Sequence, residues 1–213
     1  MPSPLKQPKQ ATEIRQASLV EAALQLASQR SPSDITTGDL AQAVGITQGA
    51  VFRHFASKEA IWLAVLDWAT DTLIARLQTA ADDAVPADPE TPRPLAALQA
   101  VFLAHVDFVI AHPGVPRIIF QELQHAEDTP LKARVRELMQ QYRKLIVGLL
   151  QQAQAQGRLV PEADLQAAAV LFIGSVQGLV MQSLLSGQVS AVAAHAPGVF
   201  AIYLRGLTSK DPP

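Results

Sequence analysis

The segment that most constrains this chain is a short predicted helix that has to end at a glycine. Thr36, with Asp39 three residues later, resembles the hydroxyl and carboxylate pair that caps the start of a helix. Leu40 and Val44 then place an apolar stripe on a helix of about two turns. Gly45 follows at the point where a left-handed residue commonly ends a helix, because glycine adopts that conformation without a steric penalty. The pattern predicts a helix followed by a tight turn.

A second short helix is predicted directly after this turn. Thr47 is a suitable N-cap, and Val51 and Phe55 form an inner face. The small side chain of Ala41 in the first helix allows the two helices to approach closely. The outward side chains, which offer hydrogen bonds or a methyl group to bases, are Thr47, Gln48, Ala50, Arg53 and His54. The arrangement predicts a helix-turn-helix, which places the start of its second helix in the major groove of DNA.

The same pattern fits a less specific alternative, in which two amphipathic helices with a glycine cap belong to an ordinary helical protein. The residues that follow favour the DNA-binding interpretation. Arg53 and His54 are suited to phosphate contacts, and Ser57-Lys58-Glu59 opens a further helix at the expected distance.

Residues 12–67 resemble the N-terminal domain of the TetR/AcrR family of bacterial transcription regulators. The family's recognition segment, Gly-Val-Ser-x-Gly-x-Leu-Tyr-x-His-Phe-x-Ser-Lys-Glu, is matched by residues 45–59. Its first helix carries the pattern Arg-x-x-x-Leu-x-x-Ala-Ala-x-x-Leu, which is matched by Arg15, Leu19, Ala22, Ala23 and Leu26. The resemblance implies a three-helix DNA-binding domain followed by a helical-bundle domain for effector binding and dimerisation.

The chain also departs from the family pattern. Ala27 stands where Phe is frequent, and Ser31-Pro32 stands where Gly is frequent. Phe52 replaces the usual Tyr, so a hydroxyl that would contact a phosphate is missing, and Arg53 can supply the charge instead. Residues 48–50 are expected to face base edges, and Arg53, His54 and Lys58 to contact phosphates. Thr36 and Thr47 are expected to cap helices and to contact phosphates as well. The expected DNA contacts are Thr36, Thr47, Gln48, Gly49, Ala50, Phe52, Arg53, His54 and Lys58.

Composition argues against several other classes of protein. The 213 residues include no cysteine, which removes disulfide frameworks, thiolate metal sites and cysteine nucleophiles. His105, His112, His125 and His195 are scattered without metal-ligand spacing, and the sequence has no Gly-x-Ser-x-Gly motif or phosphate-binding glycine loop. The net charge of −2 is weak for a DNA-binding protein, so affinity should depend on a dimer that sums its phosphate contacts. We expect no enzyme activity, no cofactor and no metal.

The rest of the chain has helical periodicity, which predicts an all-α fold. One stripe, which stops before residue 113, consists of Leu95, Leu98, Phe102, His105 and Val109. A second stripe lies between residues 131 and 149, and prolines within residues 86–94 predict an irregular connection. We expect a flexible N-terminal arm at residues 1–11, a helix-turn-helix domain at 12–58, and a helical effector-binding and dimerisation domain at 59–208.

From Leu165 to Leu204 the sequence contains no Asp, Glu, Lys or Arg. The run from residue 167 to 185 is long enough for a transmembrane helix, but Gln177 and Gln182 interrupt it. A helix that is apolar on all sides also suits a dimer, with one face in the core and the other against a partner. The resemblance implies that the last two helices, about residues 162–186 and 190–207, form a four-helix bundle with a second copy. Expected interface residues are Phe172, Gly174, Gly178 and Met181.

The resemblance further implies a cavity in the second domain, where an effector binds and releases the protein from DNA. The inward stripes carry almost no charge, which favours an uncharged or amphipathic molecule held by apolar burial. Each of the candidate residues also has a simpler interpretation as an ordinary core residue. The candidate lining residues are Phe102, His105, Phe120, Tyr142 and Phe172.

Together these features predict a cytoplasmic homodimeric repressor. It would bind a roughly palindromic double-stranded operator, would not insert into a membrane, and would be released by a small apolar or amphipathic effector. One alternative is an activator or a ligand-independent regulator. An alternative of a different class is a helical protein-interaction adaptor with a vestigial DNA-binding module.

Overall fold

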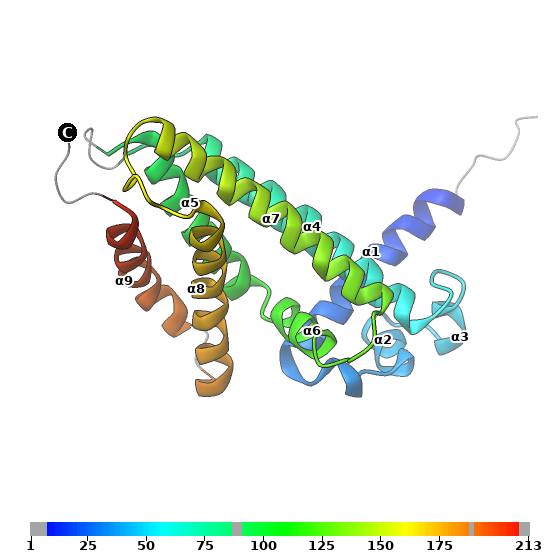
Figure 1. The fold of residues 1–213 in the computed structure, drawn as a ribbon. Helices are drawn as coiled ribbons and strands as arrows, with labels where there is room; N and C mark the ends of the chain where they lie inside the picture. Colours follow the sequence, from blue (N-terminus) through cyan, green and yellow to red (C-terminus); the bar gives the residue numbers. More distant parts are fainter. Residues whose placement is uncertain (1–7, 87–90, 188–189, 209–213) are drawn as a thin grey trace, which may run out of the picture. The chain divides into compact units, whose positions relative to one another are not determined.

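The computed structural model of this protein describes residues 8–86, 91–187 and 190–208. This part of the chain contains helices and no strand, which confirms the predicted all-α fold (Figure 1). The elements in chain order are α1 (Pro8–Gln29), the 3-10 helix η1 (Pro32–Asp34), α2 (Thr37–Ala43), α3 (Gln48–Val51), α4 (Lys58–Asp82), α5 (Arg93–Ala111), α6 (Gly114–Glu122), α7 (Pro130–Ala155), α8 (Leu165–Ser186) and α9 (Ser190–Leu207).

The first helix begins earlier than the sequence indicated. Helix α1 starts at Pro8, inside the segment 1–11 that was expected to be a flexible arm. Proline is compatible with a first helical turn, because the N–H group that it lacks would have no partner within the helix there. Residues 1–7 of the expected arm lie outside the described residues.

The chain divides into two compact units, each made of segments that are distant in sequence. One unit contains residues up to Ala69 together with His112–Val135, and the other contains Thr70–Ala111 together with the residues from Arg136 onward. The expected boundary between the helix-turn-helix domain at 12–58 and the second domain at 59–208 was placed after residue 58. The compact units differ because α6 returns to pack on α1, a contact that no local sequence signal indicates.

The first unit is built around α1, which buries Leu19, Ala23 and Ala27 completely. Helix α6 lies against this helix at Gly114, where a Cβ atom would come within 2.5 Å of the Leu24 carbonyl oxygen. A glycine is therefore required for the close approach of the two backbones, and any larger residue would force α1 and α6 apart. The small side chain of Ala27, which stands where the TetR/AcrR pattern often has Phe, lies at the same contact.

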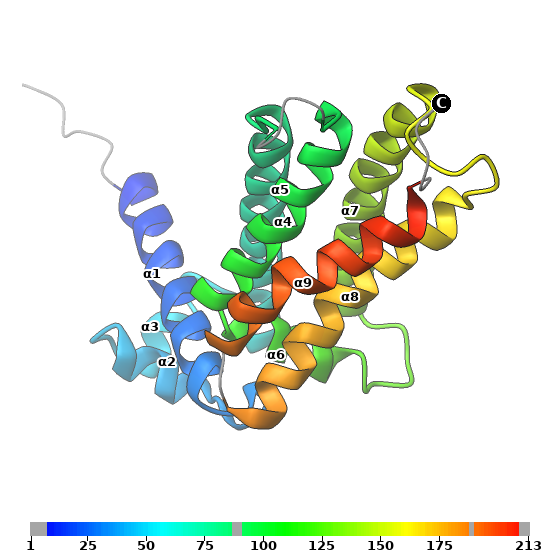
Figure 2. The ribbon, with the colours of Figure 1, turned by 90° about the vertical axis from the view of Figure 1, so that its left-hand side faces the viewer.

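The second unit has an aromatic core. The predicted inner stripe of α5, from Leu95 to Val109, is buried as expected. The ring of Phe102 meets Phe172 of α8 at 5.2 Å and Phe200 of α9 at 5.4 Å between centroids, the first pair edge to face. Such pairs contribute about 0.5–1.5 kcal/mol beyond the burial of their surface. Figure 2 shows α8 and α9 side by side, in agreement with their contacts.

Within the described residues, α5 and α8 are long and apolar enough to cross a membrane by length and composition alone. Core helices of water-soluble proteins pass the same test. In α5, 61% of the apolar window is buried by the rest of the protein, and in α8 the share is 39%. Helix α8 therefore has the larger exposed part of the two helices.

Candidate nucleic-acid interface

Helix α2 begins with the capping box that the sequence predicted. The Thr36 hydroxyl oxygen accepts a hydrogen bond from the Asp39 N–H at 3.1 Å, and the Asp39 carboxylate accepts one from the Thr36 N–H at 2.7 Å. Arg30 forms an ion pair with the same carboxylate at 3.0 Å. The hydrogen bonds from Thr36, together with Arg30, lower the pKa of Asp39 to about 2. Aspartate therefore replaces the usual Glu or Gln of this motif.

Helix α2 ends in a C-terminal cap formed by a left-handed glycine. Gly45 has a φ of 67°, in the left-handed region, as predicted. The Ile46 N–H donates to the Ala41 carbonyl at 2.9 Å and the Gly45 N–H donates to the Gln42 carbonyl at 3.2 Å. These two bonds are the Schellman pattern, which satisfies carbonyl groups left open at the end of a helix. The direction in which the next helix leaves is fixed by this geometry.

The second helix is shorter than predicted. Thr47 is its N-cap, with its side chain accepting from the Ala50 N–H. However, α3 covers only Gln48–Val51 and does not extend to Phe55, which the sequence placed on its inner face. After Val51 the Arg53 and His54 N–H groups bond three residues back, which tightens the chain into turns. Ser57 then caps α4 by accepting from the Ala60 N–H at 3.1 Å. These turns lead directly from α3 to the start of α4 at Lys58.

Most of the expected DNA contacts are exposed on this unit. The exposed members are Thr36, Thr47, Gln48, Gly49, Phe52 and Arg53, and the half-buried members are Ala50, His54 and Lys58. Phe52 is 50% exposed, so its side chain is accessible from outside the unit. The side chains of α3 and of the following turn are therefore available to a ligand.

His54 and Lys58 have protein contacts of their own. The Nδ1 atom of His54 is buried without a hydrogen-bond partner in the part of the chain that the structure describes. Its carbonyl oxygen accepts from the Gln16 side chain at 2.8 Å, which ties the turn to α1. The Lys58 ammonium group lies 3.4 Å from the Ser33 carbonyl oxygen. Both residues link the recognition segment to the rest of its unit.

One contact within the helix-turn-helix was not anticipated from the sequence. The side-chain amide of Gln48, the first residue of α3, donates to the hydroxyl of Thr37, the first residue of α2, at 2.9 Å. The sequence contained only a weak signal, a second hydroxyl residue after the predicted cap at Thr36.

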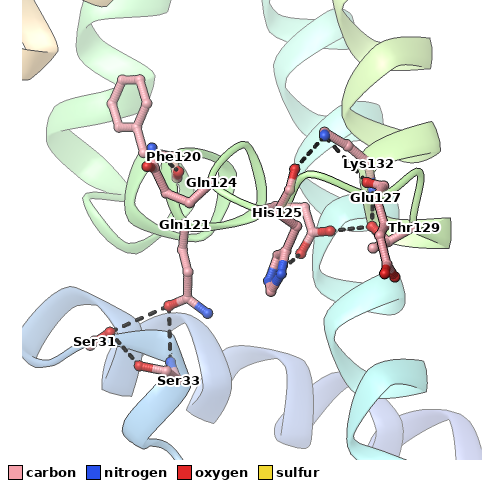
Figure 3. A network of polar contacts seen from close by, with 10 residues as sticks. Ser31, Ser33, Phe120, Gln121, Gln124, His125, Glu127, Thr129 and Lys132 are labelled. Atoms are coloured by element: carbon pink, nitrogen blue, oxygen red, sulfur yellow. Dashed lines mark hydrogen bonds and ion pairs between the residues drawn. The ribbon is translucent and has the colours of Figure 1, made fainter.

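The sequence also did not indicate a contact between α6 and the residues directly before α2. The Gln121 side-chain oxygen of α6 accepts from the Ser33 N–H at 2.9 Å and from the Ser31 hydroxyl at 3.3 Å (Figure 3). Ser31 and Ser33 lie at η1, directly before α2, so α6 holds the segment from which the helix-turn-helix begins. Nearby, the buried carboxylate of Glu122 accepts from the Thr129 hydroxyl.

Four of the expected effector residues meet in the core of the second unit. Phe102 packs on Phe172, and the Nδ1 atom of His105 lies 2.9 Å from the Tyr142 hydroxyl oxygen. Burial lowers the pKa of His105 to about 4, so the imidazole is neutral at pH 7. The fifth residue, Phe120, belongs to the other compact unit. The four rings are packed against one another in this structure.

An open groove lies elsewhere in the second unit, with a volume of about 830 Å³. Its lining combines apolar residues, glutamines and the charged residues Asp82, Arg93 and Lys144. It is lined by Ile74, Gln78, Ala81 and Asp82 of α4, by Arg93, Pro94 and Ala97 of α5, and by Gln141, Lys144, Leu145, Gly148, Leu149, Gln152 and Gln156 of α7 and the residues after it. No sequence motif pointed to this groove. Among the described residues, no group of three potential metal ligands is present.

The outer face of α8 and α9 is apolar. Large exposed side chains on it are Val170, Leu171, Met181, Leu185 and Ile202. Gly174 and Gly178 are exposed on the same helix, and a Cβ atom on either would meet nothing within 4 Å. Phe172, also expected at the interface, is fully buried in the core instead. An exposed apolar face of this kind is typical of a protein interface.

A capped helix-turn-helix whose second helix begins with exposed residues, in an all-helical chain, defines the class of helix-turn-helix DNA-binding proteins. Comparison with known families agrees. Residues 19–65 match the model of the bacterial regulatory proteins of the tetR family, and residues 119–197 match that of the tetracyclin repressor-like C-terminal domain. The chain belongs to the TetR family, and it is a DNA-binding transcriptional regulator.

Individual relatives are distant. The chain is 29% identical over 150 residues to the HTH-type transcriptional repressor KstR2 of Mycobacterium tuberculosis, a match that covers 70% of this chain and 72% of the relative. It is 28% identical over 176 residues to the nucleoid occlusion factor SlmA of Glaesserella parasuis, covering 82% and 83%. Neither of these two names is that of an enzyme.

Solved structures share the fold. The structure of KstR2 has a TM-score of 0.70 at 24% identity, with 92% of this chain and 96% of that chain covered. The fatty acid degradation regulator FadR of Bacillus halodurans has a TM-score of 0.78 at 17% identity, with coverage of 95% and 98%. A FadR of Bacillus subtilis, solved with stearoyl-CoA, has a TM-score of 0.76 at 16% identity, with coverage of 89% and 98%.

Proposed function

We propose that the protein is a cytoplasmic homodimeric repressor, without enzyme activity and without a membrane-inserted segment. Each protomer places the start of α3 in the major groove at one half of a roughly palindromic operator. The observation that carries this proposal is the exposed segment from Thr47 to Arg53, held on both sides by capped helices. A rigid segment of this kind loses little conformational freedom on binding.

The contacts divide into two groups. Arg53 and Lys58 bind phosphates and set the register, with Thr36 and Thr47 adding hydroxyl contacts. Gln48, Gly49 and Ala50 face base edges, because the N-terminal residues of a recognition helix enter the groove. His54 contributes through its exposed part, and Phe52 packs against the sugar and phosphate backbone.

The second copy binds on the outer face of α8 and α9. Gly174 and Gly178 allow a partner helix to approach closely, and Leu171, Met181 and Ile202 supply apolar surface. A dimer also suits the weakly negative net charge of −2, since two protomers together contact more phosphates than one. Phe172 supports this face from inside the protomer.

A small apolar or amphipathic effector releases the operator. Its first candidate position is the core around Phe102, His105, Tyr142 and Phe172, where the His105–Tyr142 pair can hydrogen-bond an uncharged group after the rings move apart. Phe120, which belongs to the first unit, is not part of this position. The open groove at Gly148 is the second candidate position, and its volume is within the usual range for ligand sites.

The choice of first ligand probes follows from a structural neighbour. The FadR of Bacillus subtilis was solved with stearoyl-CoA, so stearoyl-CoA and free stearate are suitable probes. His105→Phe should preserve operator binding and weaken release if the core is the site. Gly148→Leu should do so if the groove is the site, since a side chain there projects into open space. Normal release of both variants by an effective ligand would exclude both positions.

The decisive experiment is gel retardation of the DNA beside the protein's own gene, combined with sedimentation of the free protein. A specific complex that contains two protomers supports the repressor. An activator or ligand-independent regulator would form the complex but show no release by any ligand of a broad panel. A protein-interaction adaptor would form no specific complex. The similarity to a nucleoid occlusion factor keeps this last outcome in the test.

A further inference from the structure

We infer that Thr37 is a specificity-determining residue that holds Gln48 in the orientation that reads adenine. The inference rests on the proposed operator binding and adds a residue outside the set of expected DNA contacts. It starts from the 2.9 Å hydrogen bond in which the Gln48 side-chain amide donates to the Thr37 hydroxyl.

The position of both residues makes this bond relevant to DNA. Gln48 is the first residue of α3, and its side chain is exposed. Thr37 is the first residue of α2, half-buried, directly after the Thr36 cap. The capping box fixes the start of α2, and the Schellman turn at Gly45 fixes the path to α3. The donor and the acceptor are therefore both attached to rigid helix starts.

The bond leaves a defined set of groups on Gln48. Its amide has two N–H donors and one carbonyl oxygen. One N–H is committed to Thr37, so one donor and the oxygen remain for the groove. Adenine presents an acceptor at N7 and a donor at N6 in the major groove, and a glutamine pairs with both. Guanine presents two acceptors, which the remaining groups cannot satisfy together.

The same hydroxyl can couple base reading to the phosphate backbone. A threonine hydroxyl has one donor and two acceptor positions. The contact with Gln48 uses an acceptor position, and within the described residues the hydroxyl proton of Thr37 has no acceptor. A phosphate oxygen is the acceptor that DNA offers at the start of such a helix. Thr37 thereby links the position of a phosphate to the orientation of the side chain that reads the base.

Preorganisation gives the bond its effect on specificity. A free glutamine side chain samples several rotamers and can offer either end of its amide to the groove. Holding it before binding avoids an ordering cost that corresponds to roughly two- to tenfold in affinity. The benefit applies only to the base that matches the held orientation, so it increases discrimination.

The experiment begins with selection of double-stranded DNA from a random pool by the wild-type protein. The Gln48→Ala variant then identifies the symmetric position whose preference depends on Gln48. Affinities for the four bases at this position are compared for wild type, Thr37→Val, Thr37→Ser and the double variant Thr37→Val/Gln48→Ala. Thr37→Val keeps the shape and removes the hydroxyl, and Thr37→Ser keeps the hydroxyl.

The expected wild-type preference is for adenine, by about five- to a hundredfold over the other bases. Thr37→Ser retains the preference, and Thr37→Val reduces it to within a few-fold at this position alone. In the double variant the preference equals that of Gln48→Ala. Circular dichroism and the thermal midpoint check that each variant folds, and Thr37→Ala replaces Thr37→Val if the latter does not.

Three outcomes overturn the inference. They are an undiminished preference in the folded variant without the hydroxyl, a wild-type preference for a base other than adenine, and no position that depends on Gln48. Failure of the proposed function is a different result, since the wild-type protein would then select no sequence from the pool.

Discussion

The recognition segment of the first unit and the outer face of α8 and α9 are both exposed, but their construction differs. The recognition segment is positioned by hydrogen bonds at Thr36, Gly45 and Thr47, each between residues close in sequence. The outer face of α8 is positioned by apolar burial on its opposite side, where Phe172 packs into an aromatic core. Polar positioning suits a surface that must meet a polar ligand in one geometry, and apolar positioning suits a broad contact between proteins.

The comparison predicts that the second unit is the more sensitive to loss of a side chain. Phe172→Ala removes a fully buried ring and should lower the free energy of unfolding by about 3–5 kcal/mol. Urea denaturation followed by circular dichroism measures the change. The control is Gln166→Ala on the same helix, which is exposed and should change stability by less than about 0.5 kcal/mol. Equal effects of the two variants would mean that the core does not position α8.

The outer face itself is tested by Gly178→Leu. The new side chain meets nothing within the protomer, so the effect should fall on dimerisation, at about 1–3 kcal/mol or more from overpacking. Sedimentation should show weaker dimers, and operator affinity should fall with them although the recognition segment is unchanged. Gly148→Leu is the matched control, a helical glycine with similar open space on α7. An intact dimer with full operator affinity would remove Gly178 from the interface.

In the first unit the corresponding change is the loss of a cap. Thr36→Ala removes one half of the capping box and should cost about 1 kcal/mol, because an N–H group at the start of α2 loses its partner. Thermal unfolding measures the loss. Thr36→Ser keeps the hydroxyl and should restore most of the stability. A variant with alanine that is as stable as the wild type would show that tertiary contacts alone hold α2.

The same cap predicts a response to acid. The pKa of Asp39 is lowered to about 2 from its usual 3.8, so the ionised form stabilises the folded state. This contribution is present above about pH 4 and is lost as the pH falls toward 2. Asp39→Asn should therefore flatten the dependence of the thermal midpoint on pH in this window. An unchanged slope in the variant would separate the low pKa from stability.

The smallest expected effect concerns a single phosphate. Arg53→Ala should weaken operator binding for all sequences and reduce the slope of log affinity against log salt by about one. Titrations at several salt concentrations measure this slope. Gln48→Ala serves as the comparison, because it should change which operators are preferred and leave the slope close to that of the wild type. An unchanged slope for Arg53→Ala would contradict the division between phosphate and base contacts.

Much of the recognition segment could be predicted because its signals are local. The capping box, the left-handed glycine and the second N-cap each involve residues within six positions of one another, and the structure has all three. The buried stripe of α5 was predicted for the same reason, since a helical repeat appears directly in the sequence. The predicted length of α3 was wrong. The turns after Val51 still place Phe55 four residues later on the inner side, as a continuous helix would, so the sequence pattern does not show where the helix ends.

The amino-acid sequence by itself determined the all-helical fold, the capped helix-turn-helix and the family of this protein. Only the tertiary structure decided that α6 packs on α1 at Gly114, that Gln121 holds Ser33, and that Phe172 faces the core. It also decided the contact between Gln48 and Thr37, eleven residues apart. Caps, turns and helical stripes depend on neighbours in the chain. Close approaches and side-chain orientations depend on which distant segments meet, and this is settled only when the whole chain packs.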